Sequence, residues 1–141
     1  MDLTKYDSVK AAEQGAELEL RDPVSNLKSK IFIRVLGHDS KDYQRVVSKQ
    51  NQRRTSRVFQ HGRFKPGNLT DQEFKQDAIE ILAECTLSWR DETEEKPELL
   101  VVGGQRLECT KENAIRVYTE LPWIKEQVED FVTDRANFIK V

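Results

Sequence analysis

The histidines and cysteines of this 141-residue sequence, which are types that act as bases, nucleophiles or metal ligands, are His38, His61, Cys85 and Cys109. Each histidine lies beside a glycine in a predicted loop, and neither Ser nor Cys occurs in the sequence context of an activated nucleophile. The two cysteines are 24 positions apart without a nearby His or Cys, a spacing that suits neither a zinc site nor a disulfide framework. We therefore expect loop histidines and small core cysteines, with no catalytic residue and no metal.

Motifs for phosphate binding and acid–base chemistry are also missing from the sequence. Gly103-Gly104 lacks the further glycines and the lysine of a phosphate-binding loop, so it predicts a turn. Carboxylates gather in acidic runs such as residues 91–95, whereas an acid–base pair needs one desolvated carboxylate. The sequence thus predicts a protein that is not an enzyme and needs no cofactor.

A basic stretch followed by an acidic one is the strongest charge feature. Residues 41–65 contain eight bases and one acid, whereas residues 66–98 contain ten acids and three bases. The bases, with Phe59 and Phe64 interleaved, could bind nucleic acid, face an acidic protein or the chain's own acidic block, or form a solvated surface. A pI near 5.8 and the lack of a nucleic-acid-binding signature make nucleic acid the less favoured partner. The basic residues assigned to partner binding are Arg45, Lys49, Arg53, Arg54 and Arg57.

The elements that must position these side chains begin with a predicted β-hairpin over residues 16–37. Residues 17–20 alternate polar and apolar side chains, and residues 31–36 are rich in β-branched and aromatic types. Between them, residues 22–26 (DPVSN) supply turn chemistry.

A helix is predicted to begin near Lys41, where Asp39 or Ser40 can accept hydrogen bonds from its first N–H groups. It carries one narrow apolar stripe as far as Gln50. Beyond that residue the polar sequence predicts either a solvated basic helix or a fraying end, so residues 50–66 are a candidate mobile basic segment.

The next helix has the most secure start, because Thr70 and Glu73 form a capping-box pattern. Apolar residues follow at a period near 3.6 and predict a helix that extends to Trp89. The predicted buried stripe consists of Phe74, Ala78, Ile81, Leu82, Cys85 and Trp89.

A second short hairpin and two helices are predicted for the last third of the sequence. Residues 99–102 and 105–109 flank Gly103-Gly104 as candidate strands, and Thr110 is the N-cap of the helix that follows. Pro122 suits the first turn of a final helix that runs nearly to the end of the chain.

The apolar residues of this final helix admit two interpretations. Their helical spacing favours core packing, whereas an incompletely covered helix would expose them to a partner or to another copy of the chain. Under the second interpretation the contacting side chains are Trp123, Val128, Phe131 and Phe138.

Together these elements predict an α+β fold, mainly helical, in one domain over residues 1–141. An amino-terminal β-hairpin packs with about four helices in this interpretation. No stretch approaches the roughly 20 apolar residues of a membrane span, and residues 1–12 lack the apolar region of a secretory signal.

Several stretches of the sequence, taken in order, resemble one family. They are LELRDP at 18–23, GHDS at 37–40 with Tyr43 shortly after, CTLSW at 85–89, and the long run 121–138. This arrangement, which covers most of the chain, is similar to that of the small tail assembly chaperones of long-tailed, non-contractile bacteriophages and related prophages.

The resemblance implies a role in virion assembly in the host cytoplasm. Proteins of this family bind the long, largely helical tape measure protein, keep it soluble and help to bring tail tube protein to it. The family often produces a second, longer form by ribosomal frameshifting, and it has no catalytic residues. Under this hypothesis the final helix and the basic residues 45–57 contact the tape measure protein.

Two other functions stay open at the level of sequence. One is a structural or connector protein that remains in the virion. The other is a nucleic-acid-binding regulator, which predicts salt-dependent binding through Arg53, Arg54 and Arg57.

Overall fold

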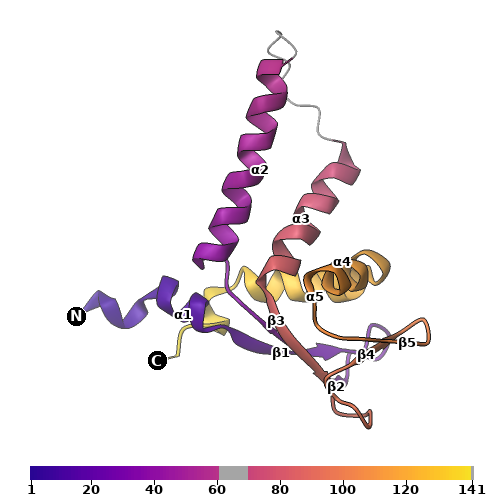
Figure 1. Cartoon of the computed structure of the whole chain (residues 1–141). Coiled ribbons are helices and arrows are strands. Elements are labelled where there is room, and N and C mark those ends of the chain that lie inside the picture. Colours follow the sequence, from indigo (N-terminus) through magenta and orange to yellow (C-terminus); the bar gives the residue numbers. More distant parts are fainter. Residues whose placement is uncertain (61–69, 141) are drawn as a thin grey trace.

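The computed structural model describes residues 1–60 and 70–140, which form an α+β, mainly helical fold (Figure 1). The α-helices are α1 (Ser8–Gln14), α2 (Lys41–Gln60), α3 (Asp71–Cys85), α4 (Lys111–Glu120) and α5 (Pro122–Val132). The strands are β1 (Ala16–Arg21), β2 (Lys28–Val35), β3 (Thr86–Asp91), β4 (Leu100–Val102) and β5 (Gln105–Leu107). Short 3-10 helices at Leu3–Tyr6 (η1) and Arg135–Asn137 (η2) lie near the two ends.

The predicted amino-terminal hairpin is confirmed and forms part of a three-stranded antiparallel sheet in the order β1-β2-β3. Its turn is organised by Asp22, whose carboxylate accepts hydrogen bonds from the N–H groups of Val24 and Ser25. Those two bonds lower the pKa of Asp22. The turn chemistry expected for residues 22–26 is therefore present.

Helices α2 and α3 form an arm that projects from the body of the protein (Figure 1). α2 begins after Ser40, whose buried hydroxyl accepts a hydrogen bond from the Tyr43 N–H at 3.2 Å. The polar sequence beyond Gln50 continues as helix to Gln60, which is the first of the two predicted alternatives. Residues 61–66 of the predicted mobile segment lie outside the described residues.

The predicted helix from Thr70 begins correctly but is too long. The Thr70 hydroxyl accepts a hydrogen bond from the Glu73 N–H, and α3 then ends at Cys85. Trp89 lies on β3 opposite Ile33, and its indole N–H donates to the Leu107 carbonyl at 3.1 Å. Trp89 matched the spacing of the predicted helical stripe by coincidence. Its side chain faces the core from a strand and not from a helix.

The buried face of α3 also differs from the predicted stripe. Phe74, at the projecting end of the helix, is 51% exposed and lies against the Arg54 guanidinium. Ile79 and Ala83, which were not in the predicted stripe, are buried. The two ends of α3 have different neighbours, so one periodic stripe cannot describe the whole helix.

The second hairpin and the two carboxyl-terminal helices are confirmed, with one correction. β4 and β5 pair across Gly103-Gly104, the Thr110 hydroxyl caps α4, and Pro122 is the first residue of α5. However, α5 ends at Val132, because Asp134 then caps the 3-10 turn η2 with its carboxylate. The short helices before residue 15 were not predicted.

The core joins the inner face of the sheet to α3, α4 and α5. Its fully buried side chains come from β1, β2, α3, α4 and α5, and Trp89 of β3 is nearly as enclosed. None of the helices in the described part of the chain is long and apolar enough to cross a bilayer. The fully buried apolar members are Leu20, Ile33, Val35, Cys85, Ala114, Val117, Tyr118, Val128 and Val132.

Candidate protein-binding groove

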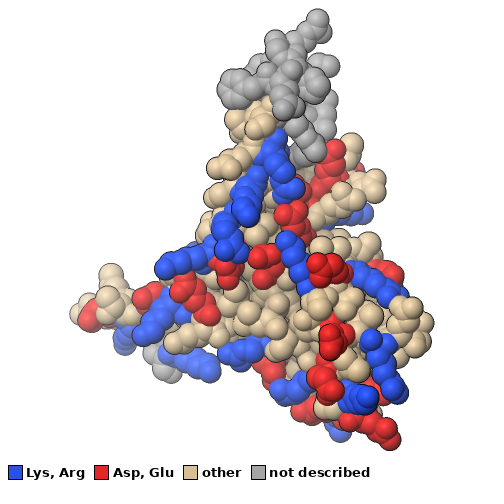
Figure 2. All heavy atoms as spheres, in the orientation of Figure 1, with Lys and Arg blue, Asp and Glu red and all other residues tan. Residues whose placement is uncertain are grey.

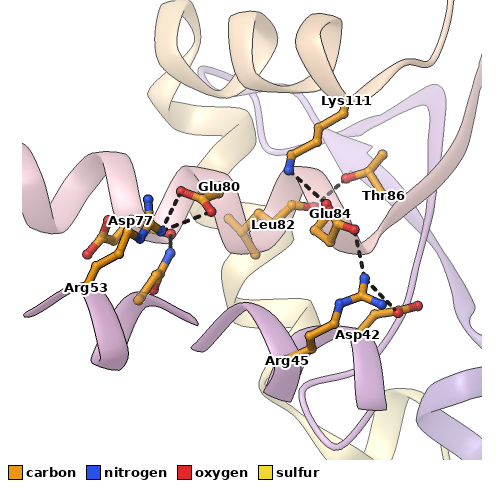
Figure 3. Close-up of polar contacts among 10 residues, drawn as sticks. Asp42, Arg45, Arg53, Asp77, Glu80, Leu82, Glu84, Thr86 and Lys111 are labelled. Carbon is orange, nitrogen blue, oxygen red and sulfur yellow. Dashed lines mark hydrogen bonds and ion pairs between the residues drawn. The ribbon is translucent and has the colours of Figure 1, made fainter. Parts of the chain in front are cut away.

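The basic residues of α2 meet the acidic residues of α3 along the arm (Figure 3). One Arg45 nitrogen lies 3.0 Å from Glu84, and one Arg53 nitrogen lies 3.2 Å from Glu80. Farther out, Arg54 lies 2.8 Å from an Asp77 oxygen. Of the alternatives open for the basic stretch, the described structure therefore contains the contact with the chain's own acidic block.

Figure 2 shows the consequence on the surface, where the basic side chains of α2 run beside acidic ones. The ion pairs with α3 offset part of the positive charge that a phosphate would meet at these arginines. Lys49 is exposed and has no ion pair among the described residues, and the side chain of Arg57 lies outside the described part. This arrangement weighs against a nucleic-acid-binding face on α2.

The aromatic and aliphatic residues predicted for partner binding belong mainly to the core. Val128 is fully buried and Phe138 is 5% exposed, so neither offers a surface to a partner in this conformation. Trp123 and Phe131 are half-buried and pack against the same core, where the Phe131 and Phe138 rings make an edge contact. The final helix is therefore a core element, in line with the first of its two interpretations.

The cysteines and histidines considered for chemistry are the next candidates for a site. Burial raises the pKa of Cys85 to about 12 and that of Cys109 to about 11, so both thiols are protonated near neutral pH. His38 places its Nδ1 atom 3.2 Å from the Val132 carbonyl oxygen. His61 lies outside the described residues.

An open groove of about 700 Å³ lies between α3 on one side and α4 and α5 on the other. Its apolar lining comes from Ile79 of α3, Ile115 and Tyr118 of α4 and Pro122 of α5, of which only Ile115 and Pro122 are appreciably exposed. The Tyr118 hydroxyl lies 2.6 Å from the Thr86 hydroxyl, and burial raises the pKa of Tyr118. The tyrosine is therefore neutral, and these residues form an uncharged floor.

Polar side chains surround this floor. The α3 wall carries Gln72, Lys75 and Gln76, and the α5 wall carries Lys125 and Glu126. An apolar floor with a polar rim is the usual arrangement of a surface that binds another protein. The geometry supports recognition of a polypeptide segment, and an amphipathic helix is the segment whose apolar stripe best matches such a groove.

None of these groove residues was among the predicted binding residues. Residues 72, 75, 76 and 79 recur at the spacing of one helical face, which was the available signal on α3. That face carries mostly polar side chains, however, so periodicity of hydrophobicity does not reveal it. Its relation to α4 and α5 depends on tertiary structure.

No protein-family model, no curated protein and no solved structure matches this chain.

Proposed function

We propose that this protein is a tail assembly chaperone of a long-tailed, non-contractile bacteriophage or prophage. It acts without enzymatic activity in the host cytoplasm, binds the tape measure protein, keeps it soluble and helps to recruit tail tube subunits. The resemblance of the sequence suggests the family. The groove between α3 and the α4–α5 pair is the observation that supports a polypeptide-binding role.

The physical basis is the unfavourable exposure of apolar helical surface to water. Before the tail tube encloses it, a tape measure protein exposes apolar helical stripes that favour aggregation. A groove whose uncharged floor exposes Ile115 and Pro122 can cover part of such a stripe. The polar rim keeps the chaperone itself soluble, so the complex presents charge to solvent.

Co-expression tests this proposal. The tape measure protein encoded beside this gene is produced alone, with the wild-type chain, or with an Ile115→Gln variant that places an amide in the groove floor. We expect the wild-type chain to raise the soluble fraction of the tape measure protein and the variant to raise it less. Equal insolubility with and without the wild-type chain would refute the proposal.

Mass spectrometry of purified particles separates the chaperone from a structural protein. A chaperone is absent from finished virions, whereas a connector is present in stoichiometric amounts. Finding this chain at such a level in particles would replace the proposal with a structural role.

A further inference from the structure

Five charged side chains line the groove, and three of them are already paired within the chain. Lys111 lies 3.0 Å from Glu84, Lys125 lies 3.3 Å from Glu129, and Glu80 binds Arg53. The other two, Lys75 and Glu126, are exposed and have no ion pair with any other residue of the described ranges 1–60 and 70–140. The folded chain thus leaves two unneutralised charges of opposite sign in the groove.

These two charges lie on different helices of the groove. Lys75 belongs to α3, beside Gln72 and Gln76, and Glu126 belongs to α5. An amphipathic helix that covers the floor with its apolar stripe presents one flank to each wall. Each flank therefore meets a charge of known sign.

We infer that the groove binds an amphipathic helix of a partner protein with an acidic residue facing Lys75 and a basic residue facing Glu126. This pair of charges selects the direction in which the helix lies. Turning the helix end for end, with its apolar stripe still on the floor, exchanges its flanks and sets like charges against each other. The inference rests on the proposed function, since it specifies the segment that the same groove takes from its client.

The chain's own exposed apolar segment is a poorer occupant. Leu3, Tyr6 and Val9 are exposed on the amino-terminal helices, which project from the side of the body away from α4 (Figure 1). That segment cannot reach the groove of its own chain from there. Occupation by a second copy would require self-association, which the experiment below monitors.

The test uses three fluorescein-labelled synthetic helices with the same leucine stripe. The first has glutamate on both flanks, the second has lysine on both flanks, and the third has glutamate on one flank and lysine on the other. Fluorescence anisotropy measures their dissociation constants at low salt. We expect the wild-type protein to bind the mixed helix most tightly, because only that helix can satisfy both Lys75 and Glu126.

Charge reversal gives the decisive comparison. Lys75→Glu should shift the preference towards the helix with lysine on both flanks by about two- to fivefold, the range of an exposed ion pair. Lys49→Glu is the matched control, since it reverses an exposed lysine on α2 and changes the net charge equally. It should leave the order of the three helices unchanged.

Several outcomes would overturn the inference. One is an equal shift of helix preference in Lys75→Glu and Lys49→Glu. Another is the absence of measurable binding of any helix. The third is a protein that self-associates in light-scattering measurements and loses helix binding when it is diluted. The result of the co-expression experiment is independent of these helix-binding outcomes. If Lys75→Glu and Ile115→Gln leave the solubilisation of the tape measure protein intact, the chaperone role stands and the groove is not its binding site.

Discussion

The ion pair between Asp39 and Arg135 allows a prediction about stability whose magnitude follows from the structure. Arg135 donates two hydrogen bonds to the Asp39 carboxylate, at 2.6 and 2.9 Å, and thereby joins η2 to the start of α2. The Asp39 side chain is only 16% exposed. Mainly because of the Arg135 hydrogen bonds, the pKa of Asp39 falls from 3.8 to about 2.

The lowered pKa of Asp39 determines how much this ion pair contributes to the folding free energy and over which pH range. A shift from 3.8 to about 2 corresponds to roughly 2.4 kcal/mol of folding free energy. Since the Arg135 side chain is 59% exposed and solvent screens the pair, we expect about 1–2 kcal/mol. The folded pKa lies below the unfolded one, so this stabilisation is present above pH ~4, is about half lost at pH ~3 and disappears as the pH falls through ~2.

The perturbation is Asp39→Asn, which keeps the size of the side chain and removes its charge. Urea unfolding of wild type and variant should differ by about 1–2 kcal/mol at neutral pH and by about half as much near pH 3. Asp130→Asn, an exposed position on α5, is the control and should change stability little at either pH. A stability difference that does not vary with pH, or that equals that of the control, would refute the stabilising role of the Asp39–Arg135 ion pair.

Two further predictions concern the backbone. Gly15 has φ 77° and ψ 171°, and a Cβ there would lie 2.9 Å from a carbonyl oxygen of β2, whereas Gly104 has the same φ but open space around it. Thermal unfolding should therefore show Gly15→Ala to be the more damaging by about 1–3 kcal/mol, and equal effects would contradict the clash. Gln127 caps the edge of β1 through two hydrogen bonds to the Arg21 backbone. Gln127→Ala should cost about 0.5–1.5 kcal/mol in urea unfolding, whereas Glu126→Ala next to it should cost less.

The predictable parts of this fold are those with a local cause. Thr70 and Thr110 cap their helices because a hydroxyl reaches an N–H three residues ahead, and that geometry needs no tertiary contact. Pro122 begins α5 for a similar reason. The turn around Asp22 is likewise closed by its own neighbours.

The errors arose where distant segments decide the structure. β3 is a strand because β2 pairs with it across residues 31–35, and nothing within 86–91 requires this partner. Trp89 was placed on a helix for that reason. The end of α5 is a different case with a local cause, because Asp134 caps a 3-10 turn and this competes with continuation of the helix.

The charge pattern shows why a binding site is harder to predict than a fold. The sequence has basic and acidic blocks, and either could face a partner, but pairing along the arm depends on which faces of α2 and α3 meet. Once they meet, Arg45, Arg53 and Arg54 are engaged with α3 and carry little information about an external ligand. The charges that can select a partner are those still unpaired after folding. Lys75 and Glu126 are inconspicuous in the sequence, and they acquire significance only because the packing of α3 against α4 and α5 places them along one groove.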